Sequence, residues 1–114
     1  MGYSIEKCVL TIPPTYNRVQ MKVIKEACLI AGLTCEDLLK EPIAAAMAFG
    51  ITKLNKPDKE YCLVVDWGAS VIDITVLCYG SKNAEIKYVK SDHTLGGSAL
   101  DLALAADSFF KFRQ

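Results

Sequence analysis

The hydrophobic residues of this chain follow a helical spacing in its first half and short strand-like runs in its second half. Residues 7–12 (KCVLTI) form a β-branched run that two prolines stop, which predicts a buried strand. Apolar residues then recur at every fourth position from Val19 to Ala31, behind a candidate cap at Asn17, and Ile24, Cys28 and Ile30 widen this stripe. This spacing predicts a helix over residues 18–31 with one buried face.

A second helix is predicted from a run of small side chains. Residues 43–49 follow Glu41 and Pro42 and precede Gly50, so a proline stands in the first turn and a glycine just past the end. Residues 35–40 lead into it as a further short strand. The small side chains allow the helix to pack closely against a flat surface or another helix.

In the second half, the hydrophobic residues form short strand-like runs instead of the helical spacing of the first half. A polar segment, residues 52–60, precedes it and marks the boundary between the halves. Three strand-like runs with short turns between them then predict an antiparallel meander; they cover residues 62–66, 71–78 and 85–89. A loop at residues 93–97 leads into a predicted helix over residues 98–112 with a wide apolar face.

Charge and hydropathy exclude several classes of function. The 114 residues contain 13 basic and 13 acidic side chains, so no basic surface for nucleic acid or anionic lipid is indicated. The apolar runs are far shorter than a membrane-spanning helix, and the first residues lack the order of a signal peptide. We therefore expect no nucleic acid, no membrane and a cytoplasmic or nuclear location. The hydrophobic share of 52% is high for a free-standing domain and suits a piece of a larger interior.

The five cysteines stand at positions 8, 28, 35, 62 and 78, with no C-x-x-C pair and one distant histidine. This spacing indicates neither a zinc site nor a disulfide framework. We expect reduced, mostly buried cysteines that act as small hydrophobic residues.

Asp66 and Asp73 flank a turn of small residues in the sequence D-W-G-A-S-V-I-D. Small residues let backbone N–H groups approach phosphate oxygens, and carboxylates suit a hydrated Mg²⁺. Taken alone, an ordinary hairpin with aspartates at its ends is the better interpretation. The same holds for Gly96 and Gly97, which precede a helix whose N-terminus would favour an anion.

Five segments together resemble the 70-kDa heat-shock chaperones of the DnaK type in order and spacing. They are I-P-P-T-Y-N (12–17), E-A-C-L-I-A-G-L (26–33), E-P-I-A-A-A-M-A-F-G (41–50), V-V-D-W-G-A-S-V-I-D-I (64–74) and H-T-L-G-G (93–97). The family typically has V-P-A-Y-F-N, D-A-G-x-I-A-G-L, E-P-T-A-A-A-I-A-Y-G, F-D-L-G-G-G-T-F-D-V and T-H-L-G-G. The match covers nearly the whole chain, which is identified as a member of that family.

The resemblance implies an α/β fold that is part of an actin-like ATPase, in which two ribonuclease-H-like lobes hold ATP or ADP with Mg²⁺. Residues 1–51 would end the first lobe, residues 52–60 would connect the lobes, and residues 61–114 would begin the second. Glu41, Asp66 and Asp73 would lie near the metal and the attacking water, and both aspartates would act on the metal through water. The phosphate-side residues would be Gly68, Ala69, Ser70, Val71, Gly96 and Gly97.

The same resemblance implies an ATP-dependent chaperone of the stress response. Its partners would be unfolded polypeptides, J-domain co-chaperones and nucleotide-exchange factors, and its site would act by positioning and electrostatic stabilisation of attack on the terminal phosphoryl group. We find no first phosphate loop, adenosine-clamping segment, interlobe linker or peptide-binding domain in the sequence. We therefore expect a fragment or truncated form that is inactive as an ATPase by itself.

The phosphate turn departs from the family pattern. Where the family has G-G-G-T, this chain has G-A-S-V at residues 68–71, so two glycines have gained side chains and a hydroxyl is lost. If the backbone there needs a positive φ or a very close approach, each Cβ costs about 1 kcal/mol or more. This predicts weakened turnover with residual nucleotide binding. Other departures put the coupling between nucleotide and substrate binding in doubt. Met21 stands where the family usually has an arginine that helps to relay the nucleotide state from a nearby proline, here Pro13. Ser98 and Ala99 replace acidic residues, and His93 and Thr94 are transposed relative to the family.

Two alternatives remain open. The first is a non-catalytic interaction module with a decayed phosphate loop, which would act through an exposed apolar face on a co-chaperone or a chaperone. The second is another actin-like protein such as a sugar kinase, which shares the aspartate hairpin but not the E-P-x-A-A-A helix. For the chain alone we expect marginal stability and self-association.

Overall fold

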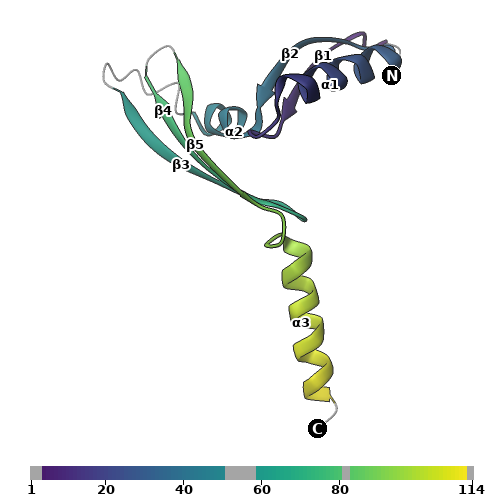
Figure 1. The fold of residues 1–114 in the computed structure, drawn as a ribbon, viewed down its shortest axis with the longest axis vertical. Coiled ribbons are helices and arrows are strands. Elements are labelled where there is room, and N and C mark those ends of the chain that lie inside the picture. The colour runs from purple at the N-terminus through teal and green to yellow at the C-terminus, as the bar shows by residue number, and fades with distance from the viewer. Residues whose placement is uncertain (1–3, 51–58, 81–82, 113–114) are drawn as a thin grey trace.

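The computed structural model describes residues 4–50, 59–80 and 83–112, which form a two-stranded sheet, a three-stranded sheet and three helices (Figure 1). The fold is α/β, as predicted, and the predicted order of strands and helices is confirmed. In chain order the elements are β1 (Lys7–Ile12), α1 (Arg18–Ile30), β2 (Thr34–Lys40), α2 (Glu41–Phe49), β3 (Glu60–Trp67), β4 (Ile72–Tyr79), β5 (Ala84–Asp92) and α3 (Gly97–Phe112).

The first unit consists of β1 and β2, paired in parallel, with α1 as the connection between them. The predicted cap of α1 is confirmed. The Asn17 side chain accepts a hydrogen bond from the Gln20 backbone N–H at 3.0 Å, and the Gln20 side chain accepts one from the Asn17 N–H at 2.9 Å. This reciprocal capping box satisfies two backbone donors that the helix leaves unpaired.

The predicted buried stripe of α1 is wrong at its four main positions and confirmed only at Ile24 and Cys28, which widened it. Cys28 is buried, while Met21 and Ile24 are half-buried, so the covered face follows the spacing 21, 24, 28. Within the described residues, α1 packs mainly on β2, which covers only one stripe of the helix. The exposed residues of the predicted stripe are Val19, Val23, Ala27 and Ala31.

The predicted burial of the first strand is also wrong. Residues along β1 alternate, with Ile12 at 1% exposure and Val9 at 60%. Side chains of a strand point to opposite faces in turn, and the described residues cover only one face of this sheet. The pairing register shifts after Cys8, which pairs with Cys35, so that Val9 pairs with Asp37.

The second unit is the antiparallel meander β3–β4–β5 that the sequence predicted. Its best-covered part is the core formed by Leu77 of β4 and Ala46 of α2, whose exposed fractions are 0% and 5%. Helix α2 packs on the meander and also contacts β1 and β2, so it lies between the two sheets (Figure 1). The close packing predicted for its small side chains is confirmed, and Gly50 ends the helix with a left-handed φ of 97°.

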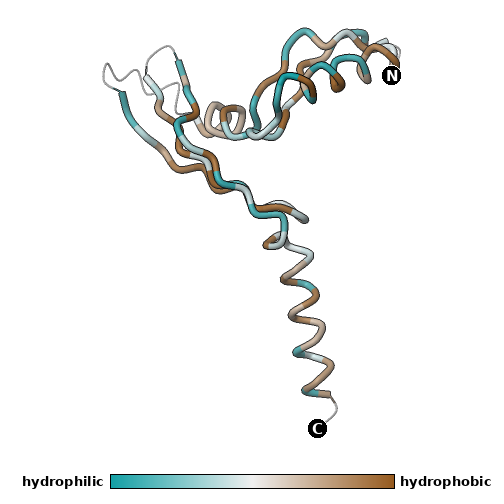
Figure 2. The backbone as a smooth tube through the Cα atoms, viewed as in Figure 1, coloured by the Kyte–Doolittle hydropathy of each residue, from teal (hydrophilic) through white to brown (hydrophobic). Residues whose placement is uncertain are grey.

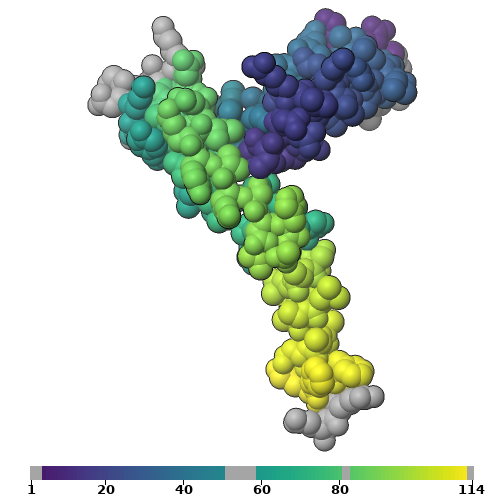
Figure 3. Space-filling view, in the orientation of Figure 1, coloured from purple at the N-terminus to yellow at the C-terminus, as the bar shows by residue number. Residues whose placement is uncertain are grey.

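The chain as a whole is extended. Its radius of gyration is 18.8 Å, whereas a compact domain of this length has about 13 Å. Helix α3 projects away from both sheets, and none of its described residues is buried (Figure 3). Hydrophobic positions run along the strands and along α3 on this open surface (Figure 2). Within the described residues no helix is both long enough and apolar enough to cross a membrane.

The cysteines are free thiols, as expected, but they are not mostly buried. Only Cys28 and Cys78 are buried, and the other three are half-buried. The open shape of the chain explains the difference. Each half-buried thiol has packed neighbours on one side only, so its other side stays accessible to solvent.

Candidate functional site

Three carboxylates from three elements come together where α2 meets the meander. Asp66 of β3 and Asp73 of β4 are partners in the pairing register, and Glu41 is the first residue of α2. Burial raises the pKa of Glu41, and the charges of Asp66 and Asp73 raise it further. The three side chains therefore form one acidic centre, which a bound cation would stabilise.

The position of Glu41 depends on its neighbour Lys40. The Lys40 Nζ donates hydrogen bonds to the backbone oxygens of Pro13 at 3.2 Å and Tyr16 at 2.9 Å. These bonds attach the end of β2 and the start of α2 to the turn that follows β1. Burial lowers the pKa of Lys40. We did not identify Lys40 from the sequence, because a lysine between a strand and a proline-bearing helix start carries no distinctive pattern.

Asp73 is oriented by Ser91. The Ser91 hydroxyl donates a hydrogen bond to Oδ1 of Asp73, and the two residues are register partners on β4 and β5. One carboxylate oxygen is therefore engaged inside the sheet. Ser91 was also missed, since a serine within a strand gives no sequence signal; only the register brings it opposite Asp73.

The two glycine-containing segments, predicted separately, lie side by side. The turn at residues 68–71 is closed by the Gly68 N–H, which donates to the Val71 oxygen at 2.9 Å. The N–H groups of Gly97 and Ser98 donate to the oxygens of Gly68 at 2.9 Å and Ala69 at 2.8 Å. The start of α3 is thus bonded directly to the turn between β3 and β4.

Gly96 is required by the closeness of this contact. A Cβ atom built on Gly96 would overlap the Ala69 oxygen and lie 2.5 Å from the carbonyl carbon of Ser70. Among the described glycines, only Gly32 and Gly50 have a left-handed φ. The requirement at Gly96 is therefore one of space and not of backbone conformation.

Four backbone donors of these segments remain available. Within the described part of the chain, the N–H groups of Ala69, Ser70, Val71 and Gly96 donate to no other backbone group. Unpaired, clustered N–H groups of this kind suit an anion such as phosphate. By contrast, the N–H groups of Gly97 and Ser98 at the start of α3 are used by the turn.

The site residues predicted from the resemblance are thus brought together in this structure. Glu41, Asp66 and Asp73 supply hard oxygen ligands of the kind that Mg²⁺ and its bound waters prefer. Three of the available donors lie in the turn between Asp66 and Asp73, and the fourth, the Gly96 N–H, lies in the segment that is bonded to this turn. The residues therefore fit a magnesium–phosphate ligand, and Val71 lacks the hydroxyl that would add one more polar group.

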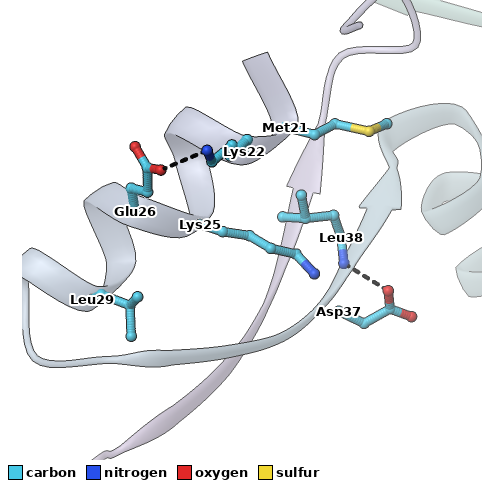
Figure 4. Close-up of a pocket in the computed structure, with 7 residues that line it drawn as sticks. All are labelled: Met21, Lys22, Lys25, Glu26, Leu29, Asp37 and Leu38. Atoms are coloured by element: carbon cyan, nitrogen blue, oxygen red, sulfur yellow. Dashed lines mark hydrogen bonds and ion pairs between the residues drawn. The ribbon is translucent and has the colours of Figure 1, made fainter. Parts of the chain in front are cut away.

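A separate groove lies between α1 and β2 (Figure 4). Three of its charged groups are engaged locally: Lys22 pairs with Glu26 at 3.7 Å, and the Asp37 side chain accepts from the Leu38 N–H at 2.8 Å. None of the predicted catalytic or phosphate-side residues lines it. Met21 does, at the position for which the resemblance implied a signalling arginine, so this groove has no guanidinium there.

Comparison with known proteins gives a consistent result. Residues 1–114 match the family described as Hsp70 protein. The chain is 40% identical over 101 residues to the chaperone protein DnaK of Ureaplasma urealyticum serovar 10, and 39% identical over 101 residues to that of Mycoplasma mobile. Each match covers 89% of this chain but 16% of the relative, so the chain spans about one sixth of the length of these proteins.

Proposed function

Because this chain belongs to the Hsp70 family of chaperones, we propose that it supplies the magnesium and phosphate side of an ATP site. The meeting of three carboxylates beside two segments with available backbone donors carries the proposal. The family also favours this function over a sugar kinase.

We assign the roles as follows. Asp66 and Asp73 accept hydrogen bonds from the waters of a bound Mg²⁺, and Ser91 keeps Asp73 in place. Glu41 orients the attacking water. When bound, the metal ion neutralises phosphate charge during phosphoryl transfer. The remaining phosphate-side residues are Gly68, Ala69, Ser70, Val71, Gly96 and Gly97, of which Gly96 allows the two segments to approach.

The division of the chain follows from this assignment. We propose that residues 1–51 end the first lobe of a nucleotide-binding domain, that residues 52–60 connect the lobes, and that residues 61–114 begin the second lobe. Helix α2, which contacts both sheets, then lies where the two lobes meet. An ATP site that needs both lobes is incomplete in this chain, so we expect hydrolysis only when the rest of such a domain is present.

For the whole protein we propose the activity of an ATP-dependent chaperone, in which hydrolysis changes affinity for unfolded polypeptides. J-domain co-chaperones and nucleotide-exchange factors would be its partners, and the cytoplasm its location. The relatives' printed name, chaperone protein DnaK, supports this proposal.

Calorimetric titration of the purified chain with Mg-ADP and Mg-ATP tests the site. We expect binding at micromolar concentrations that disappears when Mg²⁺ is chelated. Asp66→Ala should weaken it at least tenfold, which corresponds to about 1.4 kcal/mol. Asp101→Ala, an exposed aspartate on α3, serves as the matched control and should bind like the unmodified chain.

A folded sample that gives no heat with either nucleotide would overturn the proposed site. It would favour the non-catalytic interaction module, in which the G-A-S-V turn no longer takes phosphate. Equal binding by the Asp66→Ala variant would also overturn the role given to the acidic centre.

A further inference from the structure

Three cysteine side chains meet between α1 and the two-stranded sheet. Cys8 lies on β1, Cys28 on α1 and Cys35 on β2, and their Sγ atoms all lie within 4.8 Å of one another. Cys28 is buried, Cys8 and Cys35 are half-buried, and all three are free thiols. Three sulfur atoms thus converge from three elements without a disulfide.

The strand register explains two of the three positions. Cys8 and Cys35 are paired across β1 and β2, so their side chains leave the sheet on the same face. Directly after this pair the register shifts by one residue at Glu36, and Val9 pairs with Asp37. The Cys35 Sγ donates a hydrogen bond to the Asp37 oxygen at 3.2 Å, on the far side of this irregularity.

The end of α1 explains the third. The Leu33 N–H donates to the Cys28 oxygen at 2.8 Å, and the Thr34 N–H donates to the Glu6 oxygen at 2.8 Å. Gly32, just before these two donors, turns the chain with a φ of 79°. The last turns of α1 are therefore fixed beside the start of both strands, which brings Cys28 to the cysteine pair.

We propose that Cys8, Cys28 and Cys35 form a three-thiolate site for a soft, thiophilic d¹⁰ cation, such as Cu(I) or Zn(II). Thiolates select these cations over hard ones such as Mg²⁺. A Zn–S bond of about 2.3 Å separates tetrahedral ligand sulfurs by about 3.8 Å, so the present sulfurs need to approach by about 1 Å at most. Cu(I) is satisfied by three sulfurs, whereas Zn(II) takes water as a fourth ligand.

Binding exchanges protons for the metal ion. Each S–H bond that breaks releases its proton to solvent as a metal–sulfur bond forms, and no electrons are transferred. Burial raises the pKa of the Cys8 thiol, and the neighbouring Cys28 and Cys35 raise it further. None of the three residues belongs to α2, β3 or β4, and the site is therefore independent of the proposed nucleotide site.

Titration of the fully reduced chain with Cd²⁺, a spectroscopic probe for such thiolate sites, tests the proposal. We expect cadmium–thiolate charge-transfer absorption that saturates at one ion per chain. In parallel, alkylation counted by mass spectrometry should fall at Cys8 and Cys35 when Cd²⁺ is present and stay unchanged at Cys62, which is half-buried like them. Competition with Cu(I) and with Zn²⁺ then distinguishes the two cations, and displacement by either supports the site.

Variants locate the binding. Replacing Cys8, Cys28 and Cys35 by serine together should weaken Cd²⁺ binding at least tenfold, whereas the matched variant Cys62→Ser/Cys78→Ser should bind like the original chain. Saturation that survives the triple substitution, protection of other thiols in the unmodified chain, or unchanged affinity in denaturant would each overturn the proposal. The alkylation count needs no variant, so it remains decisive if the triple variant fails to fold.

Discussion

At the scale of single residues, the loop before α3 is shaped by one carboxylate. Oδ1 of Asp92 accepts hydrogen bonds from the Thr94 hydroxyl at 2.6 Å and from the Thr94 N–H at 2.7 Å. These two bonds lower the pKa of Asp92, the hydroxyl bond more than the backbone bond. The transposition of His93 and Thr94 relative to the family therefore places a hydroxyl where it closes this turn.

We expect Thr94→Val to raise the pKa of Asp92 toward its ordinary value. A carboxylate whose pKa is lowered by folding contributes stability above the ordinary pKa of aspartate and loses it as the pH falls through the lowered value. The variant should therefore be less stable than the original chain at neutral pH, and the difference should vanish in acid. NMR titration of the Asp92 carboxyl carbon and denaturant unfolding at both pH values measure these effects.

Thr15→Val, at another exposed threonine in a turn, is the control and should leave the pKa of Asp92 unchanged. An unchanged pKa in Thr94→Val would show that the backbone bond alone determines it.

The residues of the acidic centre were predicted because the segments that contain Glu41, Asp66 and Asp73 resemble those of a known family. Asp66 and Asp73 flank a short turn, so their proximity follows from the hairpin alone. The contacts of Lys40 and Ser91 were not predictable, since each depends on which strands pair and in which register. The cysteine cluster was missed for the same reason: spacing rules detect ligands that are close in sequence, and these three are brought together by a parallel pair and a helix.

At the scale of elements, the start of α1 and the end of α2 were predictable from the residues that cap them. Asn17 and Gln20 form the capping box of α1, and Gly50 ends α2 in the left-handed conformation. The sequence also predicted the meander, but pairing lengthens the first and third strands to Glu60–Trp67 and Ala84–Asp92 and shifts the second by one residue, to Ile72–Tyr79. The main positions of the predicted stripe of α1 were wrong because periodicity identifies an apolar face without identifying the neighbour that covers it.

Asn17→Ala should destabilise the first unit by about 1 kcal/mol, because the Gln20 N–H loses its side-chain acceptor. Denaturant unfolding followed by circular dichroism measures the change. Arg18→Ala, at the first residue of the same helix, removes no capping bond and is the comparison. A loss of stability in Arg18→Ala equal to that in Asn17→Ala would contradict the capping explanation.

At the scale of the whole molecule, apolar surface exceeds what the chain covers by itself. Exposed hydrophobic residues occur on β1, α1, β3 and α3, and Leu102 and Phe110 of α3 are 72% and 69% exposed. Contiguous apolar surface of this kind marks a face that another protein surface covers. A helix of the length of α3 is also only marginally stable in water when it packs against no other element.

We therefore expect the purified chain to self-associate with rising concentration, which sedimentation velocity measures. Leu102→Glu should shift the distribution toward monomer, because a charge on the exposed apolar face of α3 opposes association. Asp101→Glu, the neighbouring position with its charge kept, should behave like the original chain. A monodisperse monomer with a cooperative thermal transition would contradict this prediction.

The close approach at Gly96 also limits which substitutions the chain tolerates. What a side chain at position 96 would strike is the backbone of Ala69 and Ser70, not their side chains. Ala69 and Ser70 already carry side chains in this turn while its path is kept, whereas a Cβ at Gly68 would lie 3.3 Å from the Val71 oxygen. Position 96 tolerates no side chain, since any Cβ atom there would force the turn and the start of α3 apart. Sequence drift in this chain can thus alter the chemistry presented to a ligand well before it alters the shape of the loop.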